Sequence, residues 1–497
     1  MSARSAPASP PARHAVIAGA GLSGALLAIY LARDGWRVSV YERRPDPRAA
    51  GYAGGRSINL ALSARGLDAL AGVGLDEHVR ARDAIAMPGR MIHPLVAPGR
   101  AGDVVFQPYS VDPRDAINSV SRGGLNLTLI EAAASEPGVS LHFDRRCIDA
   151  DLSRPSAMFV ATDNSEFEEV EADLLIACDG AFSAVRLKML QTDRFEYRQS
   201  YLQHGYKELH FPPKATAGDP GVWPVNRGGG GGAEPSSRAP LDHDLFPLEP
   251  HALHIWPRGS SMMIALPNRD GSFTGTLFWP YEAIEALRTP EAVLAHFREA
   301  YPDAVPLMPT LADDFLRNPV GSLVTVRCHP WQLGGKVALV GDAAHAIVPF
   351  YGQGMNAAFE DCKHLAACLR EHPRDQRAAL EQYQRARKPA ADAIADMALE
   401  NFVEMRDKTG RPEFLYSKKV EQALHQMFPA RVHPQYNLVS FSTVPYDEAQ
   451  REGRRLARVL ERVVATVPPG GALVPGSLPW LDAVRTHGDA ALAAEGL

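Results

Sequence analysis

The sequence lacks several features that would assign it to a particular class of protein. It contains no run of about 18 apolar residues that could span a membrane, and its Ser-, Ala- and Pro-rich first residues lack the apolar core of a signal peptide. Its five cysteines are odd in number and include no Cys-x-x-Cys pair. We therefore expect no membrane partner and no disulfide framework, and we predict reduced thiols in a cytoplasmic protein.

An excess of positive charge is also missing. Acidic residues number 58 and basic residues 52, so the formal net charge is −6. This balance argues against nucleic acid or an anionic membrane as the main partner. The chain has 497 residues, which is enough for about two or three domains.

Common metal and phosphate motifs are absent too. There is no H-E-x-x-H, no Cys/His cluster at zinc spacing and no G-x-x-x-x-G-K-[ST] loop. The histidines follow no pattern, so we assign no metal site and no obligatory catalytic acid or base. His345 follows Asp342 closely, as an acid–base pair could, but we favour packing beside a cofactor or capping of the turn.

The N-terminal part does contain a dinucleotide-binding fingerprint. An apolar strand from His14 leads into the glycine motif of residues 19–24, a helix follows, and a second strand ends just before Glu42. Such glycines allow a tight turn and the approach of backbone N–H groups to a pyrophosphate, while the later acid binds a ribose hydroxyl. The pattern predicts that FAD or NAD(P) binds at Gly19, Gly21, Gly24 and Glu42.

Two further apolar strands end on an aspartate and small residues. Residues 172–178 lead into Asp179, and residues 337–340 lead through Gly341 into Asp342. Open α/β sheets bind ligands at the carboxyl ends of their strands, and a helix N-terminus after a small-residue loop suits a phosphate. An ordinary strand–helix connection remains the alternative for each segment taken alone.

Together these motifs resemble those of the single-component (class A) FAD-dependent aromatic hydroxylases. That family carries the fingerprint, an Asp-Gly motif and a Gly-Asp motif in this order, here at residues 19–24, 178–186 and 341–356. Further segments are similar to the kynurenine 3-monooxygenases within this class, and the likeness covers roughly residues 14–460. These segments are residues 55–63, 89–93, 119–122, 342–356, 401–406 and 436–442.

The resemblance implies an oxidoreductase with non-covalent FAD. NADPH would be the electron donor and O2 the co-substrate, and L-kynurenine would be hydroxylated at ring position 3 through a flavin hydroperoxide, a step of tryptophan degradation and NAD biosynthesis. The partner would be a small aromatic amino-acid substrate, and a homodimer is a further expectation. Two alternatives stay open: hydroxylation of a modified kynurenine or another anthraniloyl substrate, and a non-catalytic FAD-fold binding protein like the Rab escort proteins.

The resemblance also assigns residues to the substrate. Arg90 would bind the substrate carboxylate with Tyr109, because a guanidinium offers a bidentate fork and a phenol adds a directional donor. Asn401 and Tyr436 would complete the site, with Phe350 and Tyr351 near the substrate ring. Tyr351 departs from the Phe or His that relatives often carry there.

The remaining assignments concern FAD. Ser23 and the fingerprint glycines would contact the phosphates, Glu42 the ribose, and Asp179 and Asp342 would flank the cofactor. Other expected cofactor neighbours are Arg44, Ala61, Arg122, Gly354, Met355 and Asn356.

The predicted fold class is α/β, with a discontinuous Rossmann-like FAD-binding domain, an antiparallel β-sheet substrate domain and a C-terminal helical cap. The glycine run at residues 228–232 lies in a low-complexity stretch, which predicts a flexible insertion. The expected boundaries are 13–86 with 110–195 and 320–395 for the FAD domain, 87–109 with 196–319 for the sheet domain, 216–250 for the insertion, 396–480 for the helices, and 1–12 and 481–497 for disordered tails.

Overall fold

The computed structural model describes residues 12–50, 59–214, 241–407, 412–470 and 473–497. The predicted N-terminal tail up to residue 11 and the predicted insertion up to residue 240 lie outside these ranges. Residues 55–58, which begin one of the family-like segments, lie outside them as well.

A six-stranded sheet forms the centre of the first part of the molecule, in the order β10-β2-β1-β14-β21-β20. All neighbouring pairs are parallel except the edge pair of β20 and β21. The strands β1, β14 and β21 are apolar and wholly buried, as expected for parallel strands covered on both faces. The bounds are β10 (Val139–His142), β2 (Arg37–Tyr41), β1 (His14–Ala18), β14 (Leu174–Ala177), β21 (Val337–Leu339) and β20 (Gln332–Leu333).

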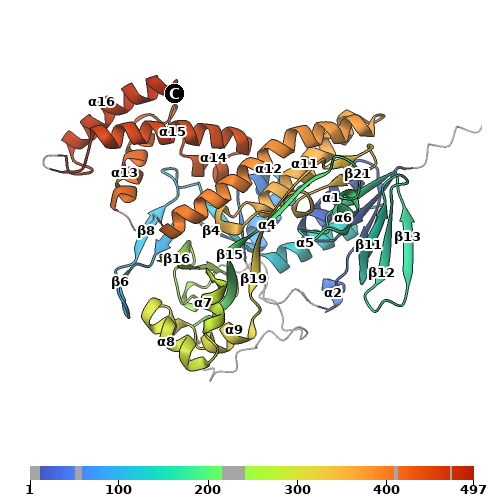
Figure 1. Ribbon diagram of the computed structural model, residues 1–497, viewed down its shortest axis with the longest axis horizontal. Helices are drawn as coiled ribbons and strands as arrows, with labels where there is room; N and C mark the ends of the chain where they lie inside the picture. Colours follow the sequence, from blue (N-terminus) through green and yellow to red (C-terminus); the bar gives the residue numbers. More distant parts are fainter. Residues whose placement is uncertain (1–11, 51–58, 215–240, 408–411, 471–472) are drawn as a thin grey trace, which may run out of the picture.

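Helices and two small sheets surround this sheet (Figure 1). Helix α1 packs against α5 and α11, and α11 packs against α3. The helices are α1 (Leu22–Arg33), α2 (Pro47–Ala50), α3 (Ala64–Ala71), α4 (Asp76–Arg82), α5 (Arg122–Ser135), α6 (Ala184–Met189), α10 (Asp342–His345) and α11 (Gly354–Glu371). The small sheets consist of β3 (Asn59–Leu62), β9 (Ile117–Ser121) and β4 (Ala84–Met87), and of β11 (Arg145–Asp151), β12 (Ser156–Ala161) and β13 (Phe167–Glu171).

A second, seven-stranded sheet has the order β19-β15-β18-β17-β16-β5-β8. Every neighbouring pair is antiparallel except β16 with β5. Three short helices, α7 (Tyr281–Ala286), α8 (Pro290–Ala300) and α9 (Leu311–Arg317), bury apolar residues against it. The strands are β19 (Gly321–His329), β15 (Glu196–Phe211), β18 (Phe273–Pro280), β17 (Ser261–Pro267), β16 (Ala252–Arg258), β5 (Gly89–Ile92) and β8 (Val105–Pro108), and the hairpin of β6 (Leu95–Ala97) and β7 (Arg100–Ala101) lies between β5 and β8 in the sequence.

Two predicted boundaries of this region were wrong. The whole of β19 pairs with β15, so the sheet continues past residue 320 before the chain returns to the first sheet. The predicted flexible insertion does not extend to residue 250, because Phe246 is 2% exposed and packs edge-on against Phe273. Phe246 is a single aromatic residue after a long low-complexity stretch, and this was too weak a signal to predict that the chain is packed against the sheet again from this point.

The C-terminal part is helical and is joined to the rest by α12 (Gln376–Asp407), which runs diagonally across the molecule (Figure 1). This unbroken 32-residue helix crosses the predicted boundary at residue 396. The other helices are α13 (Pro412–Met427), α14 (Gln435–Phe441), α15 (Tyr446–Thr466) and α16 (Leu478–Glu495).

The predicted disordered tail at residues 481–497 was also wrong. Helix α16 occupies most of it and packs against α13 and α15. The Ser477 side chain caps its first turn, and Trp480, Val484 and Leu492 are buried. The apolar spacing is helical, but the alanines and small or polar residues between these anchors concealed it.

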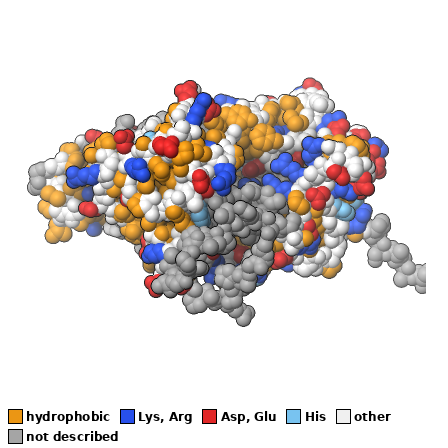
Figure 2. Space-filling view, turned by 90° about the horizontal axis from the view of Figure 1, so that it is seen from below, with side chains coloured by type: hydrophobic (Ala, Val, Ile, Leu, Met, Phe, Trp, Pro, Cys, Tyr) orange, Lys and Arg blue, Asp and Glu red, His pale blue; other side chains and the backbone are white. Residues whose placement is uncertain are grey.

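Some general properties also follow from the structure. All five cysteines are free, and Cys328, Cys362 and Cys368 are buried. Among the described helices, none is both long and apolar enough to cross a membrane. Acidic and basic side chains are intermixed on the face shown in Figure 2, so its described part presents no extended surface of one sign.

The packing of α16 generates a stability prediction. Trp480→Ala should lower the free energy of unfolding of the C-terminal helices by about 3–5 kcal/mol, because it removes a buried ring and its hydrogen bond to Tyr416. Leu478→Ala is the control, since that side chain is 76% exposed. Denaturant unfolding followed by circular dichroism would measure both, and equal small effects would show that α16 is not anchored.

Candidate functional site

The fingerprint loop connects β1 to α1 with almost no space between backbones. Gly19 has a φ of +100°, and a Cβ there would lie 2.4 Å from the Cys178 carbonyl oxygen. A Cβ at Gly24 would lie 1.9 Å from the Gly19 carbonyl oxygen. No side chain among the described residues caps α1 at Gly21, so its first N–H groups remain available for a phosphate.

Glu42 fastens this loop from the end of β2. Its Oε2 accepts a hydrogen bond from the Ala20 N–H at 2.9 Å, and its Oε1 accepts one from the Arg44 N–H at 3.0 Å. Asn126 on α5 donates to the Ala20 carbonyl from the other side at 3.0 Å. The predicted ribose acid therefore lies beside the predicted phosphate loop, whereas the Arg44 and Arg122 side chains are exposed.

The two aspartates at strand ends differ in their surroundings. The Asp179 Oδ2 accepts from the Ala184 N–H at 2.7 Å, and burial raises the pKa of this carboxyl. Asp342 is exposed at the start of α10. Arg186 joins the two motifs, because its buried guanidinium donates to the Ala181 and Ala343 carbonyls.

A buried carboxylate that the sequence did not reveal lies behind the Gly-Asp turn. Asp361 on α11 accepts from the Gly341 N–H at 3.0 Å and from Arg387 Nε at 2.8 Å, and its Oδ2 is 2.5 Å from His345 Nε2. Burial alone would raise the pKa of Asp361, but His345 and Arg387 hold it at about 2. His345 therefore pairs with Asp361 and not with Asp342, and it stacks on Trp331.

Asn356 braces the loop before α11. Its Oδ1 accepts from the Ser63 N–H at 3.0 Å, and its Nδ2 donates to the Ala61 carbonyl at 2.8 Å and the Gly352 carbonyl at 2.9 Å. Asn356 is fully buried, and Gly354 and Met355 next to it are partly buried. The structure thus brings Ala61 to the Gly-rich turn, and flavin contact by these residues stays a prediction.

The predicted substrate residues come from four separate elements. Arg90 lies on β5, Tyr109 follows β8, Tyr351 lies in the 3-10 turn Pro349–Tyr351, and Tyr436 lies on α14. The Arg90 guanidinium carbon is 5.9 Å from the centre of the Tyr109 ring. The Tyr436 ring stacks on Tyr109 with centroids 5.3 Å apart and on Tyr351 with centroids 5.7 Å apart.

Polar atoms in this cluster lack partners. The buried Arg90 Nε and Tyr109 hydroxyl have no hydrogen-bond partner of good geometry among the described residues, and Arg90 makes no ion pair with them. Burial raises the pKa of Tyr109 well above its usual range, and it also raises the pKa of Tyr436 although Arg90 opposes the effect. A cation beside neutral phenols, with donors left unpaired, fits an anionic group of a ligand.

Phe350 and Asn401 lie beside this cluster in a different way. The Asn401 Nδ2 donates to the Phe350 carbonyl at 2.7 Å, so Asn401 fixes the turn that carries Tyr351. The Phe350 ring packs on Phe402 and Phe278 and is not part of the stacked tyrosines.

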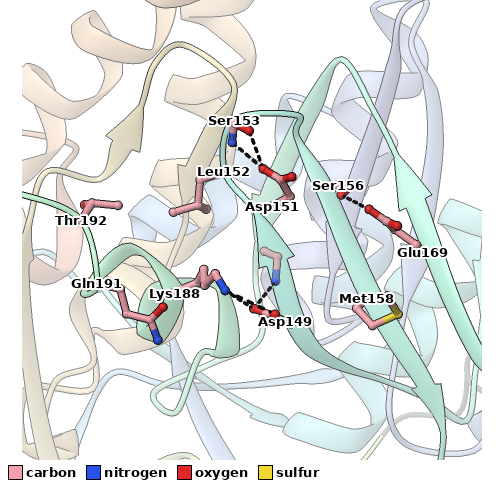
Figure 3. A pocket seen from close by; sticks show the side chains of 11 residues that line it. Asp149, Asp151, Leu152, Ser153, Ser156, Met158, Glu169, Lys188, Gln191 and Thr192 are labelled. Carbon is pink, nitrogen blue, oxygen red and sulfur yellow. Dashed lines mark hydrogen bonds and ion pairs between the residues drawn. The ribbon is translucent and has the colours of Figure 1, made fainter.

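A surface cleft of about 520 Å³ lies elsewhere, between α6 and the strands β11 to β13 (Figure 3). Asp149 in its wall pairs with Lys188, and Asp151 and Glu169 pair with Arg154. None of the predicted site residues lines it. Its charges are already paired, so we regard it as a solvated surface feature.

Comparison with known proteins agrees with this geometry. The chain matches the family described as "FAD binding domain" over residues 13–398. It is 45% identical over 444 residues to the kynurenine 3-monooxygenase of Myxococcus xanthus, with 88% of each chain covered. The chain belongs to the kynurenine 3-monooxygenase family.

Two other members of this family give similar values. The kynurenine 3-monooxygenase of Flavobacterium psychrophilum is 42% identical, with 90% of this chain and 93% of that one covered. The kynurenine 3-monooxygenase of Dictyostelium discoideum is 44% identical, with 90% and 92% covered. The resemblance inferred from the sequence motifs is thereby confirmed.

Solved structures share the fold at lower identity. A tetrameric 2-methyl-3-hydroxypyridine-5-carboxylic acid oxygenase has a TM-score of 0.60 and 21% identity, with 81% of this chain and 95% of that one covered. PqsL from P. aeruginosa, in complex with 2-aminobenzoylacetate, also has a TM-score of 0.60 and 21% identity, with 80% and 97% covered. These likenesses support the α/β fold with an FAD-binding domain and a helical C-terminal region.

In this kynurenine 3-monooxygenase family member, the buried Asp361 carboxylate generates a pH prediction. Asp361→Asn should lower the free energy of unfolding by about 3–5 kcal/mol near neutral pH, because Arg387 and His345 lose a charged partner. The folded pKa of about 2 lies below the ordinary value of 3.8, so this stabilisation is complete above about pH 4 and is lost as the pH falls through about 2.

Denaturant titrations between pH 7 and 2 would measure this prediction. The difference between wild type and Asp361→Asn should shrink over the acid range. Asp193→Asn serves as the control, since that side chain is 94% exposed. A difference that stays constant with pH would show that Asp361 is not the group that titrates.

Proposed function

We propose that this protein is an FAD-dependent aromatic monooxygenase that hydroxylates L-kynurenine at ring position 3. The observation that carries the proposal is the stacked tyrosine cluster around the buried Arg90 Nε and Tyr109 hydroxyl, which have no hydrogen-bond partner of good geometry among the described residues. Membership of the kynurenine 3-monooxygenase family supports it. A carboxylate-bearing aromatic amino acid would satisfy both donors and could pack its ring against the tyrosines.

FAD fits the glycine loop at the end of β1. The Gly19–Gly24 backbone leaves the N–H groups of α1 free for phosphates, with Ser23 beside Gly341, and Glu42 lies where a ribose hydroxyl would bind. Asp179 and Asp342 follow β14 and β21, the next two strands of the same sheet, and the Ala61–Asn356 hydrogen bond joins β3 to the start of α11. When bound, FAD supplies the oxygen-transfer chemistry, with NADPH as electron donor and O2 as oxidant.

The chain's own residues hold the substrate in this scheme. Arg90 presents its guanidinium fork to the substrate carboxylate, and the Tyr109 hydroxyl donates to the same group. Tyr436 and Tyr351 offer aromatic faces to the substrate ring and keep water away from it. Asn401 acts through the Phe350 carbonyl to hold Tyr351 in place, and no side chain is needed as an obligatory acid or base.

The finer organisation belongs to the same proposal. The six-stranded sheet would be the Rossmann-like FAD-binding part, the seven-stranded sheet the substrate side, and the C-terminal helices its cap. Free cysteines agree with a cytoplasmic location. A homodimer is retained as part of the proposal.

The decisive assay measures NADPH oxidation in the presence of kynurenine and related anthraniloyl compounds, together with the mass of the product. Kynurenine should stimulate oxidation and gain one oxygen atom. Oxidation that yields only hydrogen peroxide with every compound would contradict the proposal.

Arg90→Met tests the substrate side. It should weaken kynurenine binding about 10- to 150-fold, or roughly 1.5–3 kcal/mol, because a charged hydrogen-bond partner of the carboxylate is lost. FAD content should not change. Arg100→Met, at an exposed position of β7, is the matched control. An unaltered KM for kynurenine would show that Arg90 does not bind the substrate.

Glu42→Gln tests the cofactor side. Loss of the charge that holds the Ala20 N–H and faces the expected ribose should weaken FAD binding about tenfold. Titration of the apoprotein with FAD measures the effect, and Glu77→Gln on the exposed surface of α4 is the control. Equal FAD affinity in Glu42→Gln and wild type would contradict the assigned role.

A further inference from the structure

Arg65 on α3 contacts the carboxyl end of α14, a helix that lies beside α3 although it is far away in the sequence. Its side chain is fully buried. Its Nε donates to the Val439 carbonyl at 2.8 Å, and its Nη2 donates to the Leu438 carbonyl at 3.1 Å and to the Val444 carbonyl. The last carbonyls of a helix have no partner within the helix, and a cation at this end is favourable. Arg65 therefore caps α14.

The charge of Arg65 is balanced on the side away from α14. Its Nη1 donates to Glu360 Oε1 on α11 at 2.9 Å, and its guanidinium lies 3.9 Å from the centre of the Tyr446 ring. Glu360 is also 3.1 Å from Arg387, which binds Asp361. The cap on α14 is thus anchored in the same buried charge network that holds the Gly-Asp turn.

The other end of α14 carries Tyr436, the residue that stacks between Tyr109 and Tyr351. Helix α14 has only seven residues, which is too short to be stable on its own. Its position therefore depends on contacts with α3 and α15. Helix α15 is itself held in place, because the hydroxyl of Tyr446 at its start donates to Gln353 Oε1 at 2.9 Å in the turn before α11.

We propose that Arg65 is a positioning residue of the substrate site, which holds Tyr436 against Tyr109 and Tyr351 by capping α14. The inference rests on the proposed function, because it takes the tyrosine cluster as the place where kynurenine binds. Arg65 touches neither the substrate nor FAD in this scheme. It links the motif-bearing half of the chain to the carboxyl end of α14, the helix whose other end carries Tyr436.

Arg65→Lys in the FAD-loaded full-length protein is the primary test. A lysine keeps the charge but cannot serve Glu360 and the α14 carbonyls together. The dissociation constant for kynurenine, measured from the flavin spectrum, and the KM should both rise roughly tenfold with FAD content unchanged. More hydrogen peroxide should also form per NADPH consumed.

Arg455→Lys is the matched control. Arg455 on α15 also caps a helix end, because it donates to the Glu495 and Gly496 carbonyls at the end of α16. It should lower thermal stability, by less than Arg65→Lys because the Arg455 side chain is 31% exposed, without changing the dissociation constant for kynurenine. If Arg65→Lys lowers only stability, as Arg455→Lys does, the positioning role is overturned.

A double-variant cycle tests whether Arg65 acts through Tyr436. If it does, Arg65→Lys in the Tyr436→Ala background should add little to the loss of kynurenine affinity that Tyr436→Ala causes alone. Two losses that multiply in full would overturn the inference. If Arg65→Lys fails to fold, Glu360→Gln is the alternative variant, because it weakens the ion pair of Arg65 without removing the guanidinium. It should raise the dissociation constant for kynurenine roughly threefold. An unchanged dissociation constant would count against the positioning role of Arg65.

Hydrogen exchange separates this inference from the proposed function. In the FAD-loaded protein without substrate, amides of residues 435–441 should exchange faster in Arg65→Lys than in wild type, and not in Arg455→Lys. Unchanged exchange would overturn the cap even if kynurenine is the substrate. A different outcome is that wild-type protein neither binds kynurenine nor oxidises NADPH faster with it, while α14 amides still exchange faster in Arg65→Lys. That outcome would overturn the proposed function but would support the capping of α14 by Arg65.

Discussion

The buried carboxylate of Asp361 is the interaction on which the arrangement of the site depends. It is the acceptor for the Gly341 N–H and His345, which belong to α10 and its N-cap, and for Arg387 on α12. Without a charge at this point, the buried Arg387 would lose one of its two carboxylate partners, Asp361 and Glu360, and the turn after β21 would lose its fixed position. The Gly-Asp turn, α11 and α12 are therefore set relative to one another before any ligand binds.

The glycine loop, Glu42 and the strand-end aspartates were predictable from the sequence, because their geometry is set within a single β–α connection. The stacked tyrosines could be assigned only through the resemblance, since Tyr109, Tyr351 and Tyr436 come from distant parts of the chain. Asp361, Arg387 and Arg65 gave no local signal. A charged residue on an apolar helix face is ordinary in sequence, and only the fold shows that Arg387 pairs with Asp361 on the preceding helix and that Arg65 reaches Val439, 374 positions further along the chain.

The errors at the domain borders have a related cause. The pairing of β19 with β15 and the continuity of α12 are long-range facts, whereas composition changes gradually along the chain. Helix α16 was missed because alanine and glycine outnumber its large apolar anchors. In each case the deciding contacts are made by a few residues, such as Phe246 and Trp480, whose burial cannot be read from their neighbours.

The placement of Tyr436 on α14 has a consequence for synthesis on the ribosome. All the strands of the six-stranded sheet and the helix α11 precede residue 372, whereas α14 begins at Gln435. Domains fold largely as they emerge, the N-terminal parts first. The nascent chain can thus assemble the six-stranded sheet and its glycine loop before α14 leaves the ribosome, and a product truncated before α14 would keep these parts but lack the helix that carries Tyr436.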